Sequence, residues 1–130
     1  MVFERILVTG AAGYIGSVLV RQLLERGYTV YGVDCLLFGD GGIVDIYKHP
    51  RFKFCKGDIR ESFSYASIVE EVDVVIHLAA IVGDTACSAQ PDLARDVNFD
   101  LSKSLFLACN ETPNVRRFIS VSTCSNYGRI

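Results

Sequence analysis

Three glycines, each separated from the next by two residues, lie where an apolar run gives way to an amphipathic stretch near the amino terminus. The run is Ile6-Leu7-Val8, the glycines are Gly10, Gly13 and Gly16, and the amphipathic stretch covers residues 14–26. This order predicts a strand, a tight turn and a helix that begins inside the turn. Such a beginning constrains the chain to an α/β fold.

A helix that begins at such a turn provides a binding site for a diphosphate. Its first backbone N–H groups have no partner within the helix, and the helix dipole places partial positive charge at the same end. A diphosphate group satisfies both. A Cβ atom at Gly10 or Gly13 would forbid the dihedral angles of the turn or hold the ligand away from the amides, and Gly16 lets the helix press against its strand.

An acidic residue follows the second predicted strand. This strand covers residues 28–33, and Asp34 lies at its end, 18 residues after Gly16. A carboxylate there accepts hydrogen bonds from the ribose diol of an adenosine and repels a 2′-phosphate, so the pattern favours NAD over NADP. The alternative is an ordinary tight turn followed by a loop acid. The order of strand, turn, helix, strand and acid favours the dinucleotide interpretation.

The composition fits one globular domain. A chain of 130 residues with 50% hydrophobic content can bury a sizeable core. The formal net charge of −2 gives no electrostatic reason to expect nucleic acid or an anionic membrane as a partner. No apolar run approaches the ~18 residues that span a bilayer, and the first residues lack the features of a secretion signal, so we expect a cytoplasmic protein.

The five cysteines lie far apart, and no two of them form a Cys-x-x-Cys pair. Thiols paired at that spacing are typical of zinc sites and redox centres, so the sequence predicts no metal site and no disulfide. We expect reduced thiols that mostly fill small spaces in the core.

Two more strands and a helix are predicted in the middle of the sequence. Residues 51–56 alternate like a half-exposed edge strand, and residues 73–80 form an apolar run that is typical of a strand buried on both faces. Residues 62–71 are predicted to form the helix between them. The small residues Ala79 and Ala80 end the second run where strand order reverses, which is where such sheets bind ligands.

Two polar residues of these segments have competing interpretations. Asp58 can accept a hydrogen bond from the exocyclic amine of an adenine while Ile59 packs on the ring, or it can cap the following helix. His77 is one of two histidines, but a histidine within a buried strand is more often a hydrogen-bonded core residue than a catalytic group. We therefore assign His77 to the core.

A long helix is predicted over residues 91–110, with Pro91 in its first turn. It has an inward apolar side and a second apolar side that must be covered by a partner helix or a second subunit. The inward residues are Leu93, Val97, Leu101, Leu105 and Ala108, and the second side comprises Phe99, Phe106 and Leu107. Asn98, also in this helix, either bonds neighbouring loops near the site or is a surface residue.

The last predicted strand covers residues 117–122, and Thr123 follows it. A hydroxyl at this place can hydrogen-bond a reacting sugar or alcohol oxygen, although serine and threonine also end strands as turn formers. The order of the segments predicts a doubly wound parallel sheet with strand order 3-2-1-4-5. Its fifth strand is an exposed edge, so we expect self-association through that edge or through residues 91–110.

As a set, these motifs resemble the extended short-chain dehydrogenase/reductases, and among them the NAD-dependent epimerase/dehydratase family of nucleotide-sugar enzymes. The resemblance covers essentially the whole chain in order. It is carried by residues 9–16, Asp34, residues 57–60, residues 77–80, Asn98 and residues 122–128. It implies that residues 1–130 form an incomplete NAD(P)-binding Rossmann domain, without its last strands and without the substrate domain.

The resemblance also implies roles for the matching residues. The glycine turn binds the pyrophosphate, Asp34 the adenosine ribose, and Asp58 with Ile59 the adenine, while Thr123 hydrogen-bonds the substrate hydroxyl. The implied cofactor-contacting or supporting residues are Gly10, Gly13, Tyr14, Ile15, Gly16, Asp34, Asp58, Ile59, Leu78, Ala79, Ala80, Asn98 and Ser122.

The family's catalytic Tyr-x-x-x-Lys motif does not occur in these 130 residues, and Tyr127 does not match it. In the family the lysine lowers the pKa of the tyrosine, whose phenolate takes a hydroxyl proton while hydride passes to the nicotinamide. We therefore expect dinucleotide binding without turnover, as in the cofactor portion of a nucleotide-sugar epimerase, dehydratase or dehydrogenase. The alternative is a naturally short module that senses or holds a dinucleotide. A reading frame that continues into a Tyr-x-x-x-Lys motif would favour the first.

Overall fold

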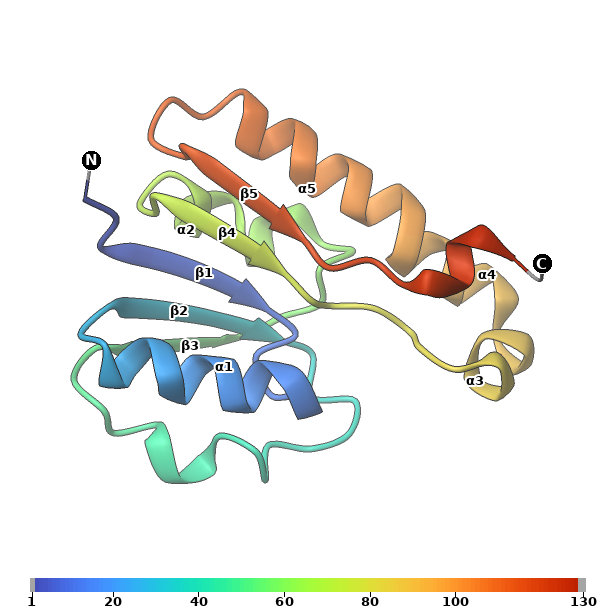
Figure 1. The fold of residues 1–130 in the computed structure, drawn as a ribbon, viewed down its shortest axis with the longest axis horizontal. Helices are drawn as coiled ribbons and strands as arrows, with labels where there is room; N and C mark the ends of the chain where they lie inside the picture. Colours follow the sequence, from blue (N-terminus) through green and yellow to red (C-terminus); the bar gives the residue numbers. More distant parts are fainter. Residues whose placement is uncertain (1, 129–130) are drawn as a thin grey trace.

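Five strands form one sheet in a computed structural model, which describes residues 2–128 of the chain (Figure 1). The order β3-β2-β1-β4-β5, with every neighbouring pair parallel, confirms the predicted fold class and strand order. The strands are β1 (Arg5–Thr9), β2 (Thr29–Asp34), β3 (Phe52–Lys56), β4 (Val74–His77) and β5 (Arg117–Ser120). Because all five run in one direction, their carboxyl ends meet at the same edge of the sheet.

Helices cover both faces of the sheet, as parallel strands require. Helix α1 (Tyr14–Glu25) packs on one face, while α2 (Ala66–Val69) and α5 (Leu101–Asn110) pack on the other (Figure 1). The short helices α3 (Asp84–Ala89) and α4 (Pro91–Arg95) lie beyond the carboxyl ends of the strands. Within residues 2–128, no helix is both long and apolar enough to cross a membrane.

Alternation along β1 divides the core into two layers. Ile6 and Val8 pack with Val20 of α1, whereas Leu7 packs on the opposite face with Leu105 of α5. None of these five side chains is more than 5% exposed. Successive side chains of a strand point to opposite faces, so an unbroken apolar run fits a strand that is covered on both sides.

The helix predicted over residues 91–110 is divided into three parts, since a π-helical segment, Asp96–Asp100, separates α4 from α5. A π turn holds more residues than an α turn, so it shifts all later residues around the helix axis. The buried residues are Ala94, Val97, Leu105 and Cys109. Of the predicted inward series, Leu93, Leu101 and Ala108 are only partly buried.

Three other elements are shorter than predicted. Residues 62–71 form a 3₁₀ turn at Ser62–Ser64 and the four-residue α2, in a stretch where serine and β-branched residues lower helix propensity. The strand expected over residues 73–80 ends at His77. The Leu78 amide is shared between the carbonyl and the side chain of Thr9, and the Ala79 amide bonds to the Thr9 side chain alone. The strand expected over residues 117–122 ends at Ser120.

The cysteines do not mostly lie in the core, so that expectation is wrong. Only Cys109 is buried, while Cys35 and Cys124 are exposed and the other two are partly covered. Burial raises the pKa of the Cys109 thiol to about 11. None of the five thiols, all within residues 2–128, forms a disulfide.

Candidate functional site

The residues singled out in the sequence lie almost entirely in the segments that follow the carboxyl ends of the strands. The glycine turn follows β1, Asp34 ends β2, and Asp58 and Ile59 follow β3. Residues 78–80 follow β4, and residues 122–123 follow β5, so all of them are placed along one edge of the sheet (Figure 1). Asn98 reaches the same edge from the π-helical segment.

Close backbone packing fixes the glycine turn. Gly10 has a φ of +72°, in the left-handed region, and a Cβ there would lie 2.9 Å from the backbone nitrogen of Ala79. At Gly16 a Cβ would lie only 2.0 Å from the carbonyl oxygen of Gly10. Gly13 is less constrained, since its Cβ would lie 3.3 Å from the same oxygen. The turn therefore needs glycine at its first and third positions to bring helix, strand and loop together.

The amino end of α1 has no neutralising side chain of its own. Gly13 caps the helix without a side-chain hydrogen bond, and its first turn contains no acidic residue. Tyr14 and Ile15, the first two helical residues, are 94% and 60% exposed. The unpaired amides and the positive end of the dipole therefore lie at the molecular surface, where an anion could reach them.

Asp34 is tied to this turn. Its Oδ2 accepts a hydrogen bond from the Ala12 amide at 3.0 Å, and its Oδ1 accepts one from the Leu36 amide at 2.8 Å. Leu36 has a φ of 60°, so the chain turns sharply after β2. Each carboxylate oxygen has two lone pairs, which leaves Asp34 with acceptor capacity for a further donor such as a diol. Asp34 is therefore part of the glycine-turn structure and not an isolated loop acid.

Arg60 engages the carboxylate of Asp58. Oδ2 accepts from the Arg60 side chain at 2.8 Å (Nε) and 2.5 Å (Nη2), and Oδ1 accepts from the Arg60 amide at 2.9 Å. These bonds hold the pKa of the Asp58 carboxyl below its usual value of 3.8. The helix-capping alternative is wrong, because Glu61 precedes the 3₁₀ turn and no side chain caps it. The side chain of Ile59, 6% exposed, packs in the core, so its backbone is the part left to face a base.

Asn98 anchors the loop after β4. Its Oδ1 accepts from the amide of Ile81 and its Nδ2 donates to the carbonyl of Ile81, both at 2.8 Å. This pair confirms the interpretation that the Asn98 amide bonds a neighbouring loop. The loop begins with the segment Leu78 to Ala80, so Asn98 supports that segment from the side of the π-helical turn.

His77 is a hydrogen-bonded core residue, as predicted. It is 4% exposed, and its two ring nitrogens lie 2.7 Å from Thr9 Oγ1 and 2.7 Å from Ser102 Oγ. Burial lowers the pKa of His77. Sequence reasoning missed Ser102 as a partner, since only the fold brings these residues together. Ser122 and Thr123 are exposed after β5.

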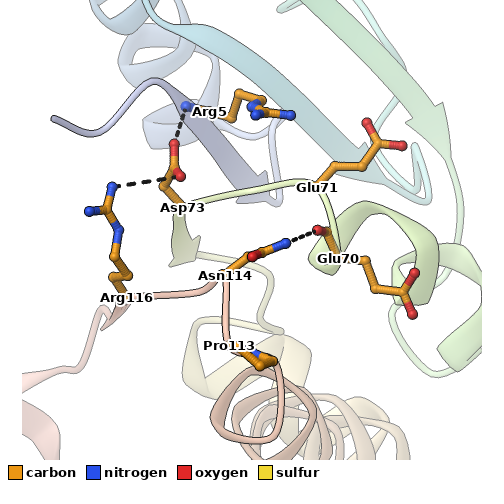
Figure 2. A pocket seen from close by; sticks show the side chains of 7 residues that line it. All are labelled: Arg5, Glu70, Glu71, Asp73, Pro113, Asn114 and Arg116. Carbon is orange, nitrogen blue, oxygen red and sulfur yellow. Dashed lines mark hydrogen bonds and ion pairs between the residues drawn. The ribbon is translucent and has the colours of Figure 1, made fainter.

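A separate hollow of about 330 Å³ lies at the opposite, amino ends of the strands (Figure 2). Asp73 faces Arg116 across it and also accepts from the amides of Glu4 and Arg5 at 2.9 Å each. Asn114 donates to the Glu70 carbonyl at 2.7 Å. These bonds join the beginnings of β1, β4 and β5. The hollow is therefore a structural junction away from the glycine turn. Among residues 2–128 no cluster of three or more side chains could hold a metal ion.

A three-layer fold with parallel strands in this order and a glycine turn after β1 defines the class of Rossmann-type folds. The chain belongs to the NAD dependent epimerase/dehydratase family, whose sequence model matches residues 6–130.

Several of the similar proteins are nucleotide-sugar epimerases. The UDP-glucose 4-epimerase of Lactobacillus helveticus is 36% identical over 126 residues, which are 95% of this chain and 37% of that protein. The UDP-N-acetylglucosamine 4-epimerase of Methanobrevibacter ruminantium M1 superposes with a TM-score of 0.88 at 29% identity over 100% of this chain and 41% of that one. A UDP-glucose-4-epimerase from Stenotrophomonas maltophila, solved with bound NAD, has a TM-score of 0.85 at 30% identity, with 98% and 39% covered. The chain thus spans about two fifths of the length of these relatives.

Proposed function

We propose that this chain binds NAD as the dinucleotide-binding part of a nucleotide-sugar epimerase or dehydratase. The observation that carries the proposal is the glycine turn: a Cβ at Gly16 would meet the Gly10 carbonyl oxygen at 2.0 Å, and the helix behind the turn presents unpaired amides at the surface. Glycine packing brings the amino end of α1 against the turn after β1, and the chemistry of the amides at that end suits a diphosphate. The residues present therefore fit the cofactor that the family uses.

The contacts of the proposed site come from the segments that follow the five strands and from the π-helical segment. The amides of Tyr14, Ile15 and Gly16 hold the pyrophosphate, with Gly10 allowing the tight turn and Gly13 leaving the backbone open to the ligand. Asp34 accepts from the adenosine ribose through the lone pairs that Ala12 and Leu36 leave open. Asp58 and the Ile59 backbone border the adenine. Leu78, Ala79 and Ala80 support the nicotinamide half, together with Asn98 and Ser122.

The proposed substrate contact is Thr123, whose hydroxyl would orient a sugar hydroxyl beside the cofactor. A bound NAD supplies hydride transfer to and from the substrate. These 130 residues contain no Tyr-x-x-x-Lys pair to take the substrate proton. The proposal for residues 1–130 is therefore binding of NAD without turnover, with modest affinity because the nicotinamide side has few contacts.

Two further statements belong to this proposal. The chain self-associates through β5 or through the exposed side of residues 91–110, which includes Phe99 at 58% exposure. It works in the cytoplasm, a compartment that keeps thiols reduced, in keeping with its unpaired cysteines.

Titration calorimetry with NAD and NADP tests the proposal on three forms of the protein. The wild-type chain is expected to prefer NAD. Asp34→Asn should weaken NAD binding by about tenfold or more, since hydrogen bonds to a charged acceptor contribute about 1.5–3 kcal/mol, and should reduce the preference over NADP. Glu25→Gln, which removes one negative charge at the exposed far end of α1, is the matched control and should change neither value. Unchanged affinity and preference in Asp34→Asn would contradict the ribose contact.

A further inference from the structure

A hydrogen-bond network of four buried or half-buried groups connects the end of β1 to α5. The Thr9 hydroxyl oxygen lies 2.7 Å from Nδ1 of His77, and Nε2 of His77 lies 2.7 Å from the Ser102 hydroxyl oxygen. The Ser102 hydroxyl also lies 3.3 Å from the carbonyl of Val97, in the π-helical segment. Thr9 is fully buried and His77 is 4% exposed, so water does not compete for the bond between them, while Ser102 is half-buried.

Counting lone pairs fixes the direction of the bond between Thr9 and His77. The Thr9 hydroxyl oxygen accepts from the amides of Leu78 and Ala79, each at 3.2 Å, and the Leu78 amide is shared with the Thr9 carbonyl at 3.2 Å. A hydroxyl has two acceptor sites and one proton. Both acceptor sites are used, so the proton must be donated, and Nδ1 of His77 is the acceptor within reach. Nδ1 therefore carries no proton.

The hydrogen bonds of Ser102 lead to the same protonation state of His77. The Ser102 hydroxyl has the Val97 carbonyl at 3.3 Å as an acceptor, and with its proton directed there its oxygen accepts from Nε2 of His77. A neutral imidazole has one protonated and one unprotonated nitrogen, and here Nε2 is the protonated one. The groups packed on the ring are Thr9 of β1, Ser102 of α5 and the ring of Phe118 of β5, and none of them is charged.

We propose that His77 is a positioning residue for the loop that follows β4, acting as the neutral tautomer with its proton on Nε2. Its Nδ1 accepts a hydrogen bond from the Thr9 hydroxyl, which leaves both lone pairs of that oxygen facing the loop amides. Without this acceptor the buried Thr9 hydroxyl has no partner for its proton and turns to another acceptor, so its lone pairs leave the direction of the loop amides and those bonds weaken.

The position of that loop matters for the proposed cofactor site, on whose existence this part of the inference rests. A Cβ at Gly10 would lie 2.9 Å from the nitrogen of Ala79, so the loop and the glycine turn touch at the centre of the site. His77 lies behind this contact and does not reach the site itself. Its effect on cofactor binding is transmitted through Thr9.

The tautomer can be measured without any ligand. A long-range ¹H–¹⁵N spectrum of the ring nitrogens, recorded on the His49→Gln protein, contains signals from His77 alone, because the chain has two histidines. We expect an unprotonated shift at Nδ1 and a protonated shift at Nε2. A protonated Nδ1 in the folded protein at neutral pH would overturn the proposal.

Two substitutions of His77 separate positioning from packing. His77→Asn keeps a carbonyl oxygen close to where Nδ1 lies, whereas His77→Leu keeps the volume without an acceptor. Hydrogen exchange at the amide of Ala79, which bonds to the Thr9 hydroxyl, should be at least about fivefold faster in the Leu variant than in the Asn variant, as expected when a net hydrogen bond is lost. Equal protection in both variants would show a packing role only and would refute the proposal.

Thr9 provides the second pair of variants. Thr9→Ser keeps the hydroxyl and should retain both the protected amides and NAD affinity, while the isosteric Thr9→Val should lose the protection and bind NAD about fivefold to tenfold more weakly. If the wild-type chain does not bind NAD at all, the proposed function fails, but the ring shifts and amide exchange still test the role of His77. If Thr9→Val protects the amides as well as Thr9→Ser does, the proposed role of the hydroxyl is wrong.

Discussion

The two edge strands of the sheet, β3 and β5, differ in how they meet solvent. β3 presents the charged Lys53 and Lys56 outward, buries Phe52 to 5% exposure and packs Phe54 against Tyr47 with ring centroids 5.4 Å apart. β5 has one charge, Arg117 at its beginning. Three of the four residues of β5 are exposed, and Ile119 is 41% accessible. Lysines are a common device against edge-to-edge pairing, and β5 lacks them.

The two edges of the sheet therefore differ in how well apolar side chains are packed and how far charged side chains protect the strand. On the β3 side, Lys53 also lies over the ring of Tyr31, so charge and apolar packing are combined in one edge. On the β5 side, Phe118 packs edge-on against Phe106 of α5, and Phe106 itself remains 48% exposed. An apolar edge with one unpaired side favours pairing with another strand, from the same or another chain.

The largest expected effect tests whether β3 is the better packed edge. Phe52→Ala removes a buried aromatic side chain that contacts the core of α1 and β2, and we expect a loss of about 3–5 kcal/mol in the free energy of unfolding. Ile119→Ala on β5 is the matched change at a half-exposed position and should cost about 1 kcal/mol or less. Urea denaturation of both variants measures the difference. Similar losses would show that the two edges are equally well packed.

Exchanging the character of the two edges should change self-association. Ile119→Lys places on β5 the kind of charge that β3 carries, and we expect the dissociation constant of the proposed dimer to rise by about tenfold, roughly the contribution of one buried aliphatic side chain. Lys53→Ile makes the opposite change on β3 and should increase association. Sedimentation velocity over a concentration series measures both. A wild-type chain that stays monomeric at high concentration would refute the proposed association.

The stability of the protein should depend on pH in two separate ranges, one set by His77 and the other by Asp58. Burial lowers the pKa of His77 below 6.5, so the unfolded state binds its proton first as the pH falls, and stability should decrease from about pH 6.5 downward. The Asp58 carboxyl, held by Arg60 after β3, has a lowered pKa, so its contribution is present above pH 3.8 and is lost only as the pH falls through its folded pKa.

Thermal unfolding of the His49→Gln protein between pH 7 and 5 isolates the first range, because His77 is then the sole histidine. His77→Asn in the same background should remove the slope. Stability that rises as the pH falls from 6.5 would mean that the folded state favours the charged ring, which is incompatible with the assigned bonds. Asp58→Asn should leave this range unchanged.

The sequence predicted what depends on local geometry. The spaced glycines, the apolar runs and the acid after the second strand each lie within a short stretch of sequence. The order of the strands and the placement of Asp34 could therefore be predicted from them. The π-helical turn did not, because one widened turn leaves no periodic signal. The bonds from Asn98 to Ile81 and from His77 to Ser102 span 17 and 25 residues, and only the folded chain selects those partners.

The smallest expected effect concerns an imperfection on the better packed side. Ser64, next to β3 and 6% exposed, has the one buried side-chain oxygen within the described residues that lacks a hydrogen-bond partner. An unsatisfied buried hydroxyl costs free energy, so Ser64→Ala should leave stability within about 0.5 kcal/mol of the wild type or raise it by about 1 kcal/mol. Ser102→Ala, which removes a bonded hydroxyl, should lower stability by about 1 kcal/mol. Denaturation in urea compares the free energy of unfolding of the two alanine variants. A larger loss of stability in Ser64→Ala than in Ser102→Ala would mean that the Ser64 hydroxyl has a hydrogen-bond partner in solution, so that no buried polar group next to β3 is unpaired.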